Sequence, residues 1–322
     1  MKTYKASLKN INVAANLLLK GGIVAFPTET VYGLGALASN KKAIERVYSV
    51  KGRPKNNPLI VHVYCLEQVL SITKGIPNNA NILIEKYWPG PLTLVLPYKN
   101  SSNICEIARA NLKTIAVRIP KHPVALKLLK KVNSPLIAPS ANIAQHLSPT
   151  KASHVLKDLG KKLLKHTDMI LDGGDTLIGL ESTVIDLTKD VPIILRPGGL
   201  NIDIINKELQ TKFNKSQYEE NKPVSPGLFK KHYSPHATLR LNADFPYKEE
   251  GWLGFGKDPN NIKEKHNMNL SLSGNLEEAA MNLFSMLRLL DEKKIKKIAV
   301  KKIPNKGIGI AINDRLNRGA SN

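Results

Sequence analysis

Apolar positions in the first two thirds of the chain follow two patterns. Some recur at helical spacing, which predicts amphipathic helices, and others form short unbroken runs that end at Pro or Gly, which predicts buried strands. We expect helices at residues 10–20, 41–50, 78–88 and 122–132, and two more that start near residues 150 and 201. The expected strands are GIVAFPT, PLIVHV, LTLVLP, TIAVRIP, PLIAPS, MILDGG, STVIDL and PIILRPG. Several late strands follow one another without a helix, so we predict a twisted, open α/β sheet of mixed strand direction.

This pattern ends near Thr211. Residues 211–237 are polar and proline-containing, and a connection of roughly 25 residues is long enough to favour a functional role. Residues 238–322 then show strands at GWLGFG, near LSLS and at KIAVKKIP, and a last helix near residues 311–318. Between them, a helix opens at Asn275, with Glu278 at capping-box spacing. We therefore predict a first domain at 1–210, a linker at 211–237 and a smaller α/β domain at 238–322.

The start of the chain is lysine-rich and then apolar, as in a signal peptide. Its apolar part is interrupted by Asn10, Asn12 and Asn16 and has helical spacing, so we interpret it as an amphipathic first helix. No apolar run approaches the ~20 residues that cross a bilayer. The two cysteines, Cys65 and Cys105, lack metal-ligand spacing and argue against a disulfide framework. We expect a cytoplasmic protein with no membrane association.

The charge balance is strongly basic, with 48 Lys and Arg against 26 Asp and Glu and a formal net charge of +22. This sign favours anionic partners such as nucleotides, RNA or acidic surfaces. However, many lysines occur in pairs on expected helix faces, where they are simply solvated. The charge alone therefore does not identify a ligand.

A glycine-containing stretch, FPTETVYGLGALA, partly matches the dinucleotide-binding fingerprint at Gly33, Gly35 and Ala38. That fingerprint needs a strand directly before its first glycine, whereas the strand expected here stops at Pro27. We therefore predict a strained loop that carries Thr and Tyr hydroxyls. The full phosphate-binding P-loop pattern is absent.

Positive charge is concentrated in the turn SVKGRPKNNPLIVH, which contains Lys51, Arg53 and Lys55. Gly52 fits the C-terminal end of a helix, and Pro54 holds the preceding Arg53 in an extended backbone. One interpretation is that these cations only complement the helix dipole. The other is that the Arg53 fork binds a phosphate. The turn by itself supports both interpretations equally.

Two further arginines, Arg118 in AVRIP and Arg196 in LRPGG, also end apolar strands close to a proline. Three such arginines, with Arg53, are unusual for a plain surface and favour a cleft that binds a polyanion. Hydroxyl and amide side chains in APSANIAQHLSPT and ESTVIDL either line that cleft or build ordinary turns.

No hydrolase nucleophile elbow, H-E-x-x-H motif or Cys/His cluster is present, and His232 and His236 look like an isolated pair in a surface linker. We therefore expect chemistry that needs neither a protein nucleophile nor a protein-bound metal. Positioning and charge neutralisation, as in phosphoryl or nucleotidyl transfer, fit that requirement.

A series of motifs occurs in one order along the chain: PTETVYGLG, KGRPKNNPLIVH, WPGPLTLVLP, TIAVRIPKHP, APSAN, SPT, DGG, ESTVIDL and LRPGG. Together they resemble the YrdC-like threonylcarbamoyl-AMP synthases. SPGLFKKHYSPHATL and GIGIAINDRLNRGAS resemble the longer, two-domain form of that family, so the resemblance covers nearly the whole chain. It implies a concave, positively charged cavity on the first sheet, a smaller C-terminal Rossmann-like α/β domain, and a long ordered linker that folds over the cavity.

The resemblance also implies a reaction, in which L-threonine, bicarbonate and ATP give L-threonylcarbamoyl-AMP and pyrophosphate. A downstream threonylcarbamoyl-transferase machinery then modifies adenosine 37 of tRNAs that read codons beginning with A. Mg²⁺ is expected to arrive with ATP, and a direct RNA contact stays open. The implied ATP contacts are Lys51, Arg53, Asn57, Thr114, Ser140, Ser148, Arg196 and the lid residue Tyr233. The implied threonine contacts are Thr30, His62, Arg118, the Ala138 backbone and Ser182.

Two other functions remain as alternatives at this point. A basic concave sheet could bind double-stranded RNA by shape, although aromatic residues are only 5% and do not alternate with basic stretches as single-strand binding requires. A nicotinamide-dependent oxidoreductase is the second alternative, and it rests on the Gly33-x-Gly35 match alone.

Overall fold

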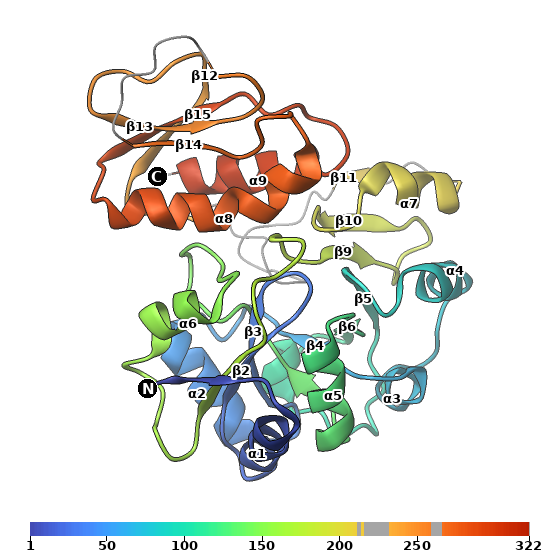
Figure 1. Ribbon diagram of the computed structural model, residues 1–322. Helices are drawn as coiled ribbons and strands as arrows, with labels where there is room; N and C mark the ends of the chain where they lie inside the picture. The colour runs from blue at the N-terminus through green and yellow to red at the C-terminus, as the bar shows by residue number, and fades with distance from the viewer. Residues whose placement is uncertain (211–213, 216–231, 259–265, 322) are drawn as a thin grey trace.

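The computed structural model describes the chain except for residues 211–213, 216–231, 259–265 and 322 (Figure 1). Its helices are α1 (Leu8–Leu19), α2 (Lys41–Lys51), α3 (Leu66–Ile72), α4 (Asn78–Tyr87), α5 (Pro123–Val132), α6 (Ala152–Leu159), α7 (Ile202–Glu208), α8 (Leu276–Glu292) and α9 (Gly309–Ala320). Its strands are β1 (Thr3–Lys5), β2 (Val24–Pro27), β3 (Tyr32–Leu37), β4 (Ile60–His62), β5 (Leu92–Pro97), β6 (Thr114–Arg118), β7 (Leu136–Ile137), β8 (Met169–Asp172), β9 (Thr183–Asp186), β10 (Ile193–Arg196), β11 (Asn214–Lys215), β12 (Thr238–Ala243), β13 (Glu250–Gly254), β14 (Asn267–Asn269) and β15 (Lys297–Lys301).

The first domain is built on a large mixed sheet, as the pattern of short strands predicts. Within the described residues, its 11 strands have the order β1-β8-β2-β3-β7-β4-β6-β5-β9-β10-β11. Parallel pairs such as β4–β6 and β5–β9 alternate with antiparallel pairs such as β2–β3 and β5–β6. The mixed strand direction follows from the short connections between consecutive strands, which permit antiparallel pairing but not a parallel crossover.

The stretch predicted as a strained loop is instead a β-hairpin. Thr28 forms its turn, because the Thr28 Oγ1 accepts the Val31 N–H at 3.2 Å and donates to the Val31 carbonyl at 2.7 Å. Gly33 and Gly35 lie inside β3, and a Cβ built on Gly35 would lie 2.6 Å from the Phe26 ring. Here glycine permits close packing between two strands and forms no phosphate-binding turn. The nicotinamide alternative therefore loses the motif on which it rests.

Helices cover both faces of the sheet, and the side chains alternate between them. On β2, Val24 and Phe26 pack into the core with α1 and α5, whereas Ala25 faces the core that includes α2 and α6. The same alternation holds on β4, where Val61 joins the α2 side. Ile60 and His62 point the other way, into a pocket. The strand alternation thus separates core residues from candidate site residues.

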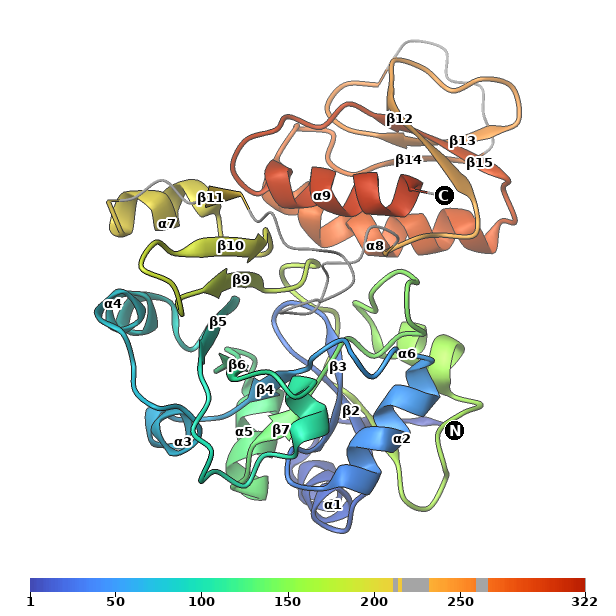
Figure 2. The ribbon, with the colours of Figure 1, turned by 180° about the vertical axis from the view of Figure 1, so that it is seen from behind.

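The second domain has a smaller parallel sheet of order β12-β15-β13-β14, counting the described strands. α8 and α9 both lie on the face of this sheet that is turned towards the first domain (Figures 1 and 2). The expected capping of α8 is present, because the Asn275 Oδ1 accepts the Glu278 N–H at 2.8 Å. Two details differ from the sequence-based expectation: β12 was not predicted, and β14 ends just before LSLS, where Ser271 caps the backbone N–H of Asn275.

Two arginines of the second domain reach into the first. Arg288 on α8 forms a double hydrogen bond with Asp158 on α6 at 2.6 and 3.0 Å. Arg315 on α9 donates to Glu181 at 2.8 Å. The predicted linker at 211–237 lies largely outside the described residues, so its ordered conformation stays a prediction, as do the domain boundaries. Among the helices that the structure describes, none is both long and apolar enough to cross a membrane.

Candidate active site

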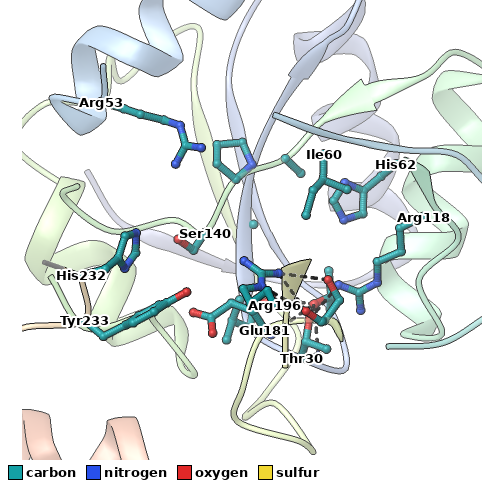
Figure 3. Close-up of a pocket in the computed structure, with 16 residues that line it drawn as sticks. Thr30, Arg53, Ile60, His62, Arg118, Ser140, Glu181, Arg196, His232 and Tyr233 are labelled. Atoms are coloured by element: carbon teal, nitrogen blue, oxygen red, sulfur yellow. Dashed lines mark hydrogen bonds between the residues drawn. The ribbon is translucent and has the colours of Figure 1, made fainter. Parts of the chain in front are cut away.

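A pocket opens on the first sheet beside the ends of β4, β6 and β10 (Figure 3). It brings together nine of the residues that the family resemblance implies: Thr30, Arg53, His62, Arg118, Ala138, Ser140, Ser182, Arg196 and Tyr233. Segments far apart in sequence supply them, and the order of strands in the sheet places them around one space. The other lining residues are Thr28, Val31, Gly33, Ile60, Pro139, Glu181 and His232.

Arg118 dominates one side of the pocket, where threonine binding is predicted. It stands at the end of β6 beside His62 of β4, since the two residues are register partners. Its Nη2 contacts the Glu29 Oε1 at 2.5 Å, its Nη1 donates to the Thr30 Oγ1 at 3.0 Å, and its Nε donates to the Gly90 carbonyl at 3.1 Å. These bonds fix the guanidinium plane and leave one hydrogen on each terminal nitrogen for a ligand.

Glu29 and His62 show how this side is charged. Burial alone would raise the pKa of Glu29, but the charge and hydrogen bond of Arg118 outweigh it and hold that pKa below its usual value. Burial, together with the charge of Arg118, lowers the pKa of His62 to about 3. The imidazole is therefore neutral at pH 7, and its Nδ1 has no hydrogen-bond partner in the described structure. Such an unpaired buried atom is costly unless a ligand satisfies it.

The other side of the pocket holds cations without carboxylate partners. Arg53 donates to the carbonyls of Asn57 and Pro58 at 3.3 and 2.9 Å, and Arg196 donates to the Ser182 carbonyl at 2.9 and 3.1 Å. Lys51 is 1% exposed and donates to the carbonyls of Ser140 and Asn142. Among the described residues, none of these three cations forms an ion pair.

Their burial has an electrostatic consequence. Desolvation, followed by the charge of Arg53, lowers the pKa of Lys51 well below its ordinary value. Desolvation also lowers the pKa of Arg53 to about 10. A bound polyanion would relieve both effects, because it supplies the missing opposite charge. Gly52 terminates α2 in the left-handed conformation as expected, and phosphate binding by the turn Lys51–Lys55 stays a prediction that these shifts favour.

Four of the residues implied for ATP do not line the pocket. Lys51 lies behind Ser140, and Asn57 is buried with its Oδ1 unpaired. Thr114 begins β6 opposite Pro97. Ser148 is buried and donates its hydroxyl to Glu181. Their roles as ATP contacts stay predictions.

Seven lining residues were not predicted as site residues, and two of them, Glu181 and His232, carry ionisable side chains. His232 was interpreted as part of a surface linker, which is wrong for its position. Its ring packs 4.0 Å from the Tyr233 ring, and burial lowers its pKa to about 3. Tyr233 has a left-handed backbone (φ +61°) and is 2% exposed, so the chain turns sharply here and brings both rings inward. The sequence signal was only adjacency to Tyr233.

Glu181 lies between Tyr233 and Arg196 in the pocket (Figure 3). Burial would raise its pKa, but Arg315 and then Arg196 outweigh this and keep it below the usual value. The pocket lining thus combines two neutral histidines, the arginine-paired carboxylate of Glu181, and two arginines, Arg53 and Arg196, that have no carboxylate partner among the described residues. Glu29 and Lys51 contact lining residues without lining the pocket themselves. This arrangement suits binding a phosphorylated ligand beside a small carboxylate.

Comparison with known proteins gives the class first. The family model Sua5/YciO/YrdC, whose description is "telomere recombination", matches residues 16–198. A second model, described as "Threonylcarbamoyl-AMP synthase, C-terminal domain", matches residues 200–321. The chain therefore belongs to the Sua5/YciO/YrdC family, in the form that carries this second domain.

Particular relatives are similar over nearly their whole length. Threonylcarbamoyl-AMP synthase of Pyrococcus abyssi is 39% identical, covering 96% of this chain and 94% of its own. The Bacillus subtilis enzyme of the same name is 38% identical, covering 95% and 92%. A crystal structure of P. abyssi Sua5 complexed with L-threonine superposes with a TM-score of 0.88 at 36% identity, covering 99% of this chain and 96% of that one.

Proposed function

We propose that this chain is an L-threonylcarbamoyladenylate synthase. It would convert L-threonine, bicarbonate and ATP into L-threonylcarbamoyl-AMP and pyrophosphate, for modification of adenosine 37 in tRNAs that read codons beginning with A. The observation that carries the proposal is the division of one pocket into two sides. Arg118 stands with Thr30 at one end, Arg53 stands at the other, and Arg196 lies between them, held by the Ser182 carbonyl (Figure 3).

The Arg118 side fits the amino acid. The guanidinium is immobilised by Glu29, Thr30 and Gly90, and its remaining donors can hold the threonine carboxylate as a fork. His62 presents a neutral imidazole with an unpaired Nδ1, which can hydrogen-bond the bound amino acid or carbamate. The backbone of Ala138 and the hydroxyls of Thr30 and Ser182 would complete this side. The crystal structure of the P. abyssi relative contains L-threonine, which supports threonine as a ligand of this pocket.

The opposite side fits ATP. The amine of threonine attacks the carbon of bicarbonate and water leaves, which gives a carbamate. A carbamate oxygen then attacks the α-phosphorus of ATP, and the bond between that phosphorus and pyrophosphate breaks. Negative charge then accumulates on the transferred and leaving groups. This charge would be neutralised by Arg53 and Arg196, and by Lys51 behind Ser140. Hydrogen bonds to backbone carbonyls already fix these side chains, so they would not have to rearrange during the reaction. No side chain in this scheme acts as a covalent nucleophile.

Mg²⁺ is proposed to accompany ATP on its phosphates and to shield their charge when bound. The pocket carboxylates do not fit a protein-built metal cage, since Glu29 and Glu181 are each paired with an arginine. Elsewhere in the described residues, no cluster of three His, Cys, Asp or Glu side chains could hold a metal. The proposed reaction therefore uses no protein-bound ion.

Tyr233 and His232 are proposed to close over the nucleotide. Both rings lie against the pocket at the end of the predicted linker, whose preceding residues 216–231 are outside the described structure. A cover of this kind would keep water from a hydrolysable adenylate. We also interpret the cavity as basic and concave and the second domain as Rossmann-like, supported by its parallel strands.

The test is pyrophosphate release by the purified chain from ATP and Mg²⁺, with and without L-threonine and bicarbonate. We expect release that requires both co-substrates, and a product with the mass of threonylcarbamoyl-AMP. Release that ignores threonine, or none at all, would overturn the proposal. In that case, RNA binding that weakens steeply with salt would favour the double-stranded RNA alternative.

A further inference from the structure

The second domain sends one charged side chain to the wall of the pocket. Arg315 of α9 is 1% exposed, and its Nε donates to the Glu181 Oε2 at 2.8 Å. Its Nη2 donates to the Pro197 carbonyl at 2.9 Å, directly after Arg196. Its guanidinium carbon lies 4.8 Å from the centre of the Tyr233 ring, within cation–π distance.

These contacts join separate pieces of the ATP side. Glu181 lines the pocket ahead of β9, and its other oxygen, Oε1, accepts the Ser148 hydroxyl. Pro197 follows β10, and Tyr233 comes from the end of the linker. The Arg315 guanidinium therefore contacts Tyr233 directly, reaches Ser148 through Glu181, and binds the carbonyl of the residue that follows Arg196. Ser148, Arg196 and Tyr233 are three of the predicted ATP contacts.

The charge of Glu181 makes this arrangement necessary. A buried carboxylate beside a phosphate site repels ATP unless a cation compensates it. Arg196 is close, but its hydrogen bonds go to Ser182, whereas Arg315 binds Glu181 directly. Removing Arg315 would leave the buried Glu181 carboxylate in the pocket wall without its ion-pair partner. Such a loss costs far more free energy than the loss of a surface ion pair.

We propose that Arg315 is a positioning residue through which the second domain completes the ATP side of the pocket. It compensates the charge of Glu181, which shares the guanidinium with Asp314, and it holds Glu181, Pro197 and Tyr233 in one arrangement. The inference deepens the proposed function and rests on it for the identity of the nucleotide. It assigns a role to the second domain, which would supply part of the site rather than serve only as a support.

Four variants of the full chain test the proposal: Arg315→Met, Glu181→Gln, the double variant, and Asp158→Asn. Asp158→Asn is the matched control, because it weakens another inter-domain ion pair, that of Asp158 with Arg288, and neither of these two side chains lines the pocket. Each variant is measured for ATP dissociation constant by calorimetry, for ATP and threonine KM, and for thermal midpoint.

We expect Arg315→Met to weaken ATP binding about tenfold or more, with a much smaller change in threonine KM. Adding Glu181→Gln should restore a large part of that loss, because the uncompensated charge is gone, and Asp158→Asn should leave ATP binding nearly unchanged. Equal ATP loss in Asp158→Asn, or additive losses in the double variant, would overturn the proposal by showing that Arg315 acts only through domain docking. Calorimetry measures ATP binding independently of turnover. A wild-type chain that binds ATP but releases no pyrophosphate would therefore refute the proposed reaction, while the ATP affinities of the variants would still test the role of Arg315.

Discussion

Arg118 and Glu29 form a buried ion pair, with 2.5 Å between the arginine Nη2 and the carboxylate Oε1. The pair fixes the arginine in the wall of the pocket, while Thr30 and Gly90 hold its other nitrogens. A guanidinium held in this way can meet a substrate carboxylate without losing further side-chain freedom.

Arg118→Ala is expected to abolish threonine-dependent turnover while much of the ATP binding is kept, because the arginine lies on the opposite side from Arg53. Since the change leaves Glu29 buried and unpaired, Arg118→Ala is compared with the double variant Arg118→Ala/Glu29→Gln. Pyrophosphate release and ATP calorimetry measure the two effects separately. Equal loss of ATP binding in the well-folded double variant would show that Arg118 is assigned to the wrong side.

Affinity for ATP is predicted to fall as pH rises, and to begin falling at a lower pH than the titration of an exposed lysine would cause. Burial and Arg53 lower the pKa of Lys51, so in the free protein this lysine loses its proton, and its attraction for phosphate, at lower pH than an exposed lysine would. Lys51→Arg should flatten the decline. Lys55, which is in the same turn with a side chain that is 67% exposed, provides the control, and Lys55→Ala should keep the wild-type pH profile. A pH-independent ATP affinity in the wild type would contradict the prediction.

Acid should destabilise the fold through two histidines of the pocket, the buried His62 and the half-buried His232. The unfolded chain binds a proton on each histidine near pH 6.5, whereas folding lowers the pKa of His62 and His232 to about 3. The unfolded state therefore binds more protons between these values, and the free energy of unfolding decreases as pH falls from about 6.5 towards 3. One such linkage has a limiting slope of about 1.4 kcal/mol per pH unit.

Urea unfolding at a series of pH values measures this slope. The paired carboxylates Glu29 and Glu181 also lose stabilising charge in acid, so the variant His62→Gln is needed to isolate one imidazole. It should have a shallower slope than the wild type, whereas His166→Gln, at an exposed position, should not. Identical slopes in all three proteins would show that His62 does not titrate as described.

Gly35→Ala is predicted to destabilise the first domain by about 1–3 kcal/mol, because its new methyl group would overlap the Phe26 ring. A smaller ring neighbour should relieve the overlap, so Phe26→Leu added to Gly35→Ala ought to cost less than the sum of the two single changes. Thermal unfolding of the four proteins gives this coupling. Strict additivity would mean that the hairpin adjusts without strain.

Sequence-based prediction of secondary structure was correct where a residue's local preference agrees with its role in the folded chain. Gly52 both ends α2 and begins the turn that aims Arg53, and the apolar runs of β5 and β6 are buried on account of their own composition. β3 was missed because its glycines, which locally suggest a loop, are needed only for contact with Phe26. β12 was missed because the sheet partner that stabilises it, β15, is far away in sequence.

The candidate site shows the same limit. Three arginines beside prolines could be recognised as a group, since each has the same local signature. Glu181 and His232 have no such signature, because their positions depend on Arg315 from the last helix and on the left-handed turn at Tyr233. Only the folded chain brings these partners together, and no sequence periodicity connects them.

The alternation along β4 has a consequence for how this chain can change. Ile60 and His62 face the pocket, while Val61 between them faces the core, so pocket and core residues alternate along the strand. Deleting or inserting one residue in β4 would exchange the two sets, burying an imidazole among aliphatic side chains and turning a valine to the ligand. A deletion or insertion in this strand should therefore disrupt both the fold and the pocket. Loops far from the pocket, such as the exposed stretch around Lys189, should tolerate a deletion or insertion.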